Sequence, residues 1–209
     1  LLDSNSNPLL ENSSELPSYR DHVTSFGQAV FELDPGKYHL TVEHGPEWMP
    51  VSRSISILPG MNITNVTVKL DRIVNMVAED WWSGETHIHR PIDQVELLMR
   101  SEDLHFGQVL SWWNQRNPWA NTPLPTSLVR QFDSNRFVHL IGGEDERDGG
   151  ALLFLNMAQP LDILEGRKHY PSSLVYAQQA KTAGAWIDIE KPFWWDVPMW
   201  IAHGIGDSI

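Results

Sequence analysis

The chain has 209 residues, 41% of them hydrophobic, which is enough for one large domain or two small domains with a packed core. Its 27 acidic and 15 basic residues give a formal net charge of -12, which repels phosphate backbones and argues against nucleic-acid binding. No apolar run approaches the roughly 20 residues that span a bilayer, and the lack of cysteine excludes disulfides and thiolate metal ligands.

Cellular location is open on this evidence. The chain starts at Leu1 and shows no basic-then-apolar leader. We expect a secreted or periplasmic protein whose leader has been removed, and a cytoplasmic location stays open as the alternative.

Residues 1–76 are predicted to form a small antiparallel β-sandwich. A turn at residues 34–37 precedes an alternating stretch at 38–44, and two further strands are expected at 52–58 and 62–70. The expected core positions of the last strand are Ile63, Val66, Val68 and Leu70. The turn sequence Pro35-Gly36-Lys37-Tyr38 and the strand that follows resemble the carboxypeptidase regulatory-like and prealbumin-like domains.

Residues 77–209 change to strands that alternate with helices, the pattern of βαβ units in a parallel α/β sheet. Strands are expected at 84–89, 106–112, 137–142, 151–156 and 184–189, with another near Asp207. One helix is expected from an N-cap at Asp93, and a second from Ser172 or Ser173 through Ala180. A full barrel needs about 250 residues, so we expect this domain to be a barrel truncated at its C-terminus.

The most informative stretch of this half is Gly84 to Pro91. Successive side chains of a strand point to opposite faces, so His87 and His89 are predicted to share one face, with Ile88 on the other. Neutral imidazole is the commonest metal ligand in proteins. The pair therefore indicates a metal site at the end of a strand. The alternative is that both histidines lie on a solvent-exposed face of the strand.

Residues 80–89 resemble the opening motif of the polymerase and histidinol phosphatase (PHP) superfamily of metallohydrolases, and most closely its CehA/McbA (carbaryl hydrolase-like) branch. The resemblance implies a distorted, TIM-like α/β barrel that binds two or three divalent ions and hydrolyses ester, amide-like or phosphoester bonds. It also implies that His87 and His89 are metal ligands and that Glu144, in Gly142-Gly143-Glu144, is a carboxylate ligand. A solvated charge in an acidic loop is the alternative for Glu144.

The chain departs from the family pattern at three places. Residues 111–114 lack the Asp-His of the second strand, and residues 149–150 stand where the family has Gly-His. Glu190-Lys191-Pro192 replaces the His-Pro of the later strand. A lysine ammonium has no lone pair to donate, so Lys191 cannot bind a metal but can take the space and charge of a second ion.

Two functions compete on this evidence. In the first, one divalent ion, zinc before manganese or iron, is held by His87, His89 and Glu144 and activates water for hydrolysis, with Lys191 and Glu190 as candidate catalytic residues. In the second, the metal centre has decayed and the protein binds a carbohydrate or another protein, using tryptophans such as Trp194 and Trp195. A small-molecule or glycan-like substrate is expected, and the oligomeric state stays open.

Overall fold

The computed structural model describes residues 1–3, 5, 16–62, 64–163 and 169–209. By its internal contacts the chain divides into two compact units. The first unit comprises Leu1–Ser83 and Asp93–His105, and the second comprises Gly84–Ile92 and Phe106–Ile209. The domains predicted from sequence, 1–76 and 77–209, stay a prediction.

The first unit contains two short antiparallel ribbons. Strand β3 (Gly36–Val42) pairs with β4 (Val51–Ile57), and β1 (Ser18–Tyr19) pairs with β2 (His22–Val23). The unit also holds the 3-10 helix η1 (Met76–Glu79) and all but the first residue of helix α1 (Ile92–Ser101). The strands predicted at 38–44 and 52–58 are therefore confirmed, and they pair with each other.

The predicted β-sandwich is wrong for the residues that the structure describes. Strands β3 and β4 form a sheet of two strands, and within them Tyr38 is the single buried residue. No strand forms over the described part of 62–70, where Val66 is 41% exposed, and Ile63 lies outside the described residues. Alternation identifies the more apolar face of a ribbon but does not say whether a second sheet covers it.

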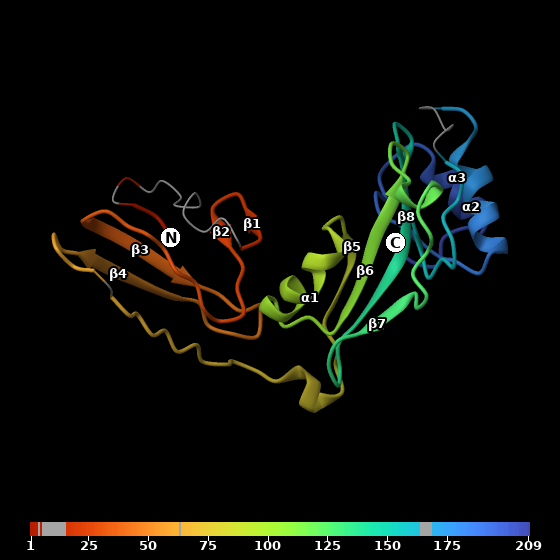
Figure 1. The fold of residues 1–209 in the computed structure, drawn as a ribbon. Helices are drawn as coiled ribbons and strands as arrows, with labels where there is room; N and C mark the ends of the chain where they lie inside the picture. The colour runs from red at the N-terminus through yellow and green to blue at the C-terminus, as the bar shows by residue number, and fades with distance from the viewer. Residues whose placement is uncertain (4, 6–15, 63, 164–168) are drawn as a thin grey trace. The chain divides into compact units, whose positions relative to one another are not determined.

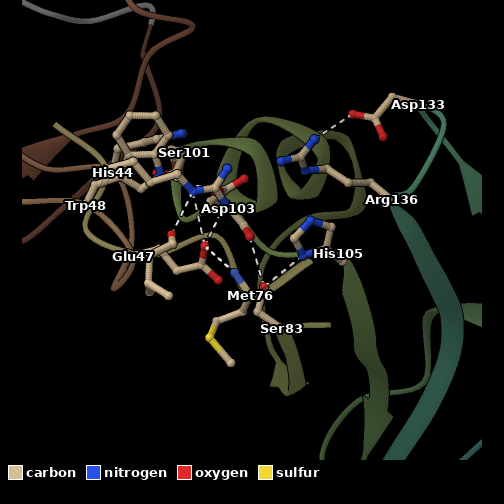
Figure 2. Close-up of polar contacts among 12 residues, drawn as sticks. His44, Glu47, Trp48, Met76, Ser83, Ser101, Asp103, His105, Asp133 and Arg136 are labelled. Atoms are coloured by element: carbon tan, nitrogen blue, oxygen red, sulfur yellow. Dashed lines mark hydrogen bonds and ion pairs between the residues drawn. The ribbon is translucent and has the colours of Figure 1, made fainter. Parts of the chain in front are cut away.

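In the first unit, a network of largely buried charged side chains joins segments that lie outside its strands and helices. The Arg72 guanidinium lies 2.6 Å from a carboxylate oxygen of Glu47 and 2.9 Å from one of Asp103. The Trp48 indole N–H donates to the same Asp103 oxygen at 3.1 Å, beside the hydrogen bond that joins Ser83 to His105 (Figure 2). These contacts supply polar partners for acids that are less than a tenth exposed, as buried charges require.

The second unit is built on one six-stranded mixed sheet with the order β10-β9-β8-β6-β5, in which β7 also pairs with β8. Figure 1 shows four of these strands, β5, β6, β8 and β7. The bounds are β5 (Gly84–Ile88), β6 (Phe106–Trp113), β7 (Val129–Gln131), β8 (Phe137–Arg147), β9 (Gly150–Leu155) and β10 (Trp186–Ile189). Strands β5, β6 and β8 are parallel, whereas β7, β9 and β10 each pair antiparallel with a neighbour. The five strands predicted in this half are confirmed, whereas β7 was not predicted.

The predicted α/β barrel is wrong. Among the described residues only three α-helices occur, namely α1, α2 (Ser173–Thr182) and α3 (Val197–Ala202), beside the 3-10 helix η2 (Pro118–Ala120). Strands β8 and β9 are joined by two residues, Asp148 and Gly149, rather than by a crossover helix. A two-residue connection can only join antiparallel strands, so the parallel βα repeat of a barrel ends at β8. Near Asp207 the chain makes an isolated bridge, between Asp188 and Ser208, and not the predicted strand.

The sheet curls strongly enough to bring its two ends together. Strands β5 and β10 are four strand spacings apart in the sheet order, which is roughly 19 Å in a flat sheet. His87 of β5 nevertheless lies 3.3 Å from Glu190, the residue that follows β10. The core of the unit is fully buried and includes Trp112, Leu140, Ile141, Leu152, Phe154, Ile187 and Trp200.

Helix α2 contacts β9 and β10 and is placed by local signals that the sequence carries. The Ser172 hydroxyl accepts a hydrogen bond from the Leu174 amide at 3.3 Å, which is the expected N-cap interaction. The prediction of this helix is confirmed. Asp93 lies in the first turn of α1, where a carboxylate stabilises the helix dipole, and is not its N-cap.

Candidate metal centre

The candidate centre lies at the carboxyl ends of the parallel strands. His87 is the fourth residue of β5, His89 follows the strand directly, and Ile88 between them is buried. Glu144 of β8 pairs with Trp113, the last residue of β6. Because β10 runs antiparallel to β9, and β9 antiparallel to β8, β10 points the same way as β8 and delivers Glu190 to the same edge.

Three potential ligand atoms converge there. The Nε2 atoms of His87 and His89 are 3.0 Å apart, and Glu144 Oε2 lies 2.9 Å from His89 Nε2 and 3.7 Å from His87 Nε2. An ion bound about 2.0 to 2.2 Å from three tetrahedral ligands separates those ligand atoms by roughly 3.3 to 3.6 Å. The triangle therefore fits one small divalent ion after shifts of about 0.5 Å, and its two imidazoles and one carboxylate suit zinc.

Electrostatics of the centre favour a bound cation. Glu144 is buried, with a side chain only 6% exposed, and this burial raises its pKa, although the charges of His87 and His89 partly offset the rise. The negative charges of Glu146 and Glu190 raise it further. Burial is therefore the main cause of the raised pKa, and a divalent ion at Nε2 and Oε2 would lower it again by supplying positive charge.

Two of the predicted site residues, Glu190 and Lys191, lie on the other side of His87. Glu190 Oε1 is 3.3 Å from His87 Nδ1, and its second oxygen is 3.3 Å from Lys191 Nζ. The Lys191 ammonium also donates to Glu146. Burial pulls the pKa of Lys191 down, but the hydrogen bonds and charges of Glu146 and Glu190 outweigh this effect and raise it, so Lys191 is a permanent cation.

Close packing between β6 and β8 positions Glu144. A Cβ atom on Gly143 would lie 2.2 Å from the buried Trp112 ring, so only glycine allows this approach of the two strands. Trp112 in turn stacks on Phe154 with ring centroids 5.9 Å apart. The next residue of β6, Trp113, places its ring edge-on against His89 at 4.9 Å. The paired glycines are therefore explained by packing, and they bring the carboxylate within reach of the histidines.

Asn114 is the last of the residues 111–114 that lack the Asp-His of the family pattern, and it has a structural role. The Asn114 amide donates to Asp145 at 2.5 Å and accepts from the Glu146 backbone N–H at 2.7 Å. Both ends of this side chain therefore fasten the end of β6 to β8.

Sequence reasoning missed the ion pair next to the centre. Asp145 is fully buried and accepts from Arg147 Nε at 2.6 Å, and Arg147 also lies over the Tyr176 ring at 5.2 Å. Asp145 and Arg147 are two apart on one strand and so share a face, which is the signal that could have identified them. The run of charges at 144–148 instead left a solvated acidic loop open as the alternative.

The five residues predicted for the site therefore lie together, although their roles stay predictions. No family model, curated protein or solved structure matches this chain. Within the described ranges, no helix is long and apolar enough to cross a membrane, as expected from the sequence.

Proposed function

We propose that this protein is a metal-dependent hydrolase related to the CehA/McbA branch of the PHP superfamily, with one zinc ion, or alternatively manganese or iron, at His87, His89 and Glu144. The convergence of these three ligand atoms, each 2.9 to 3.7 Å from the next, is the observation that carries the proposal. When bound, the ion would act as a Lewis acid and lower the pKa of a water molecule toward neutrality.

The protein side chains would have two further roles in this reaction, which are to leave a coordination position open and to stabilise negative charge. Three protein ligands leave a coordination position open, as in catalytic rather than structural zinc sites. Lys191, kept positively charged by Glu146 and Glu190, can stabilise negative charge that develops on a carbonyl or phosphoryl oxygen. The bond cleaved would be an ester, a carbamate or amide-like bond, or a phosphoester.

The substrate would be a small or glycan-like molecule, and the proposed location is secreted or periplasmic. Directly after Lys191 and Pro192, the side chains of Phe193 and Trp195 are 96% and 82% exposed. Aromatic rings that stay in solvent beside a polar centre suit the apolar face of a sugar or an aromatic group.

Zinc binding tests the proposal before any substrate is known. The metal-free protein should bind one zinc ion per chain by isothermal titration calorimetry, and His87→Ala should lower the affinity at least a hundredfold by removing one of three ligands. His139→Ala, which removes a buried histidine of β8 outside the triangle, is the matched control. Equal zinc content in His87→Ala and the unaltered protein, measured by plasma emission, would contradict the proposal.

The second candidate is a catalytically decayed protein that binds a carbohydrate or another protein. The exposed Phe193 and Trp195 favour this alternative, because binding modules present aromatic rings in this way. A glycan array probed with the metal-free protein separates the two functions. Binding that Trp195→Ala abolishes and zinc does not alter would support the binding module and argue against the hydrolase.

A further inference from the structure

We infer that Glu190 is a positioning residue that fixes the tautomer of His87, holding the ring proton on Nδ1 so that the Nε2 lone pair faces His89 and Glu144. The inference rests on the proposed function, because it concerns a ligand of the proposed centre. It differs from the sequence prediction of Glu190 as a catalytic residue, and it assigns the residue a contact that the sequence could not show.

The two ring nitrogens of His87 face different partners. Nδ1 lies 3.3 Å from Glu190 Oε1, whereas Nε2 lies 3.0 Å from His89 Nε2 and 3.7 Å from Glu144 Oε2. An ionised carboxylate only accepts hydrogen bonds, so the nitrogen that faces Glu190 is the one that carries the proton. In the neutral ring the other nitrogen, Nε2, then keeps its lone pair.

Glu190 is itself restrained by a backbone hydrogen bond and by an ion pair. Its backbone N–H donates to the Ala151 carbonyl at 3.2 Å, which fixes the chain where it leaves β10. Its second carboxylate oxygen lies 3.3 Å from the Lys191 ammonium, and the side chain is only 26% exposed. A carboxylate held in this way can orient an imidazole, whereas a mobile surface carboxylate cannot.

The same geometry argues against Glu190 as a fourth direct ligand. Its nearer oxygen approaches the Nδ1 edge of the His87 ring, and the ligand triangle lies on the Nε2 edge. A carboxylate that accepts the far N–H of a ligating histidine makes that histidine a stronger ligand, and loss of such a carboxylate typically lowers metal affinity 10- to 100-fold.

The test compares Glu190→Ala with Glu146→Gln. Both substitutions remove a carboxylate that contacts Lys191, but only Glu190 contacts His87. In the metal-free protein at pH 8, long-range ¹H–¹⁵N correlation spectra should show His87 protonated on Nδ1, and Glu190→Ala should shift the ring toward the Nε2-protonated form. Zinc affinity from chelator competition should fall about 10- to 100-fold in Glu190→Ala, and less than threefold in Glu146→Gln.

Three results would overturn the inference: an unchanged tautomer in Glu190→Ala, an unchanged zinc affinity in that variant, or an equal loss in Glu146→Gln. If Glu190→Ala does not fold, Glu190→Leu, which also removes the hydrogen-bond acceptor, carries both measurements. The spectra need no metal, so the tautomer assignment stands or falls separately from the proposed function. If the protein binds no zinc but its His87 tautomer depends on Glu190, the proposed hydrolase function is wrong and the inference that Glu190 fixes the tautomer holds.

Discussion

Two adjacent carboxylates of β8 are both buried, yet their surroundings differ in kind. Asp145 points to Arg147, a permanent cation whose side chain is 5% exposed, and its charge is neutralised within the fold. Glu144 points to two imidazoles, which are cations only when protonated, and burial raises its pKa. The charge of a buried acid paired with arginine is already compensated, so the pair stabilises the fold. The charge of a buried acid that contacts two histidines is compensated only when a histidine is protonated or a cation binds. This contrast makes Glu144, and not Asp145, the candidate metal ligand.

The largest effect is expected from Asp145→Ala. The substitution leaves the buried Arg147 guanidinium without its carboxylate, and breaking a buried pair in this way typically costs about 3 to 5 kcal/mol. The free energy of unfolding from urea titration should therefore fall by that amount. Glu146→Gln, which alters an acid that is 57% exposed, should cost less than about 1 kcal/mol. Similar losses in the two variants would mean that the Asp145–Arg147 pair does not stabilise the fold.

A smaller effect, and a different kind of effect, is expected from Glu144→Gln. Because burial penalises the Glu144 charge, the amide should leave the stability of the metal-free protein within about 1 kcal/mol of the parent. Zinc at a hundred times its dissociation constant should stabilise the parent by about 2.7 kcal/mol and the variant much less. Thermal unfolding with and without zinc measures both. A metal-free variant as unstable as Asp145→Ala would remove the contrast between the two carboxylates.

The smallest effect concerns His139, a third buried ionisable group on β8. Burial lowers its pKa below 6.5, and its Nδ1 lies 3.1 Å from the Gln108 amide nitrogen. The unfolded chain therefore takes up the proton first, so the free energy of unfolding should fall as the pH drops below about 6.5. His139→Leu lacks this loss, and its stability deficit relative to the parent should be smaller at pH 5.5 than at pH 7.5 in urea titrations. His169→Leu, at a side chain 71% exposed, is the control, and a pH-independent deficit would contradict the prediction.

The sequence predicted the strands of the second unit and the grouping of the site residues better than it predicted the architecture. Apolar runs such as 151–156 indicate a buried strand but carry no information on its direction. The signal for direction was Asp148-Gly149, a dipeptide typical of two-residue hairpins. The resemblance instead led us to treat the overlapping residues 149–150 as the place of a lost histidine. The contact between Glu190 and His87 could not be predicted, because it depends on how far the sheet curls.

The position of β5 in the sheet has a kinetic consequence. Among the described strands β5 pairs with β6 alone, and that pairing shifts register between Glu85 and Ile88, whereas β8 has neighbours along both edges. An ion held by His87 and Glu144 would cross-link β5, which is paired along one edge, to β8, which is paired along both. Its dissociation rate would then be governed by how often β5 detaches from the sheet, and a long residence time would not require unusually strong ligand bonds.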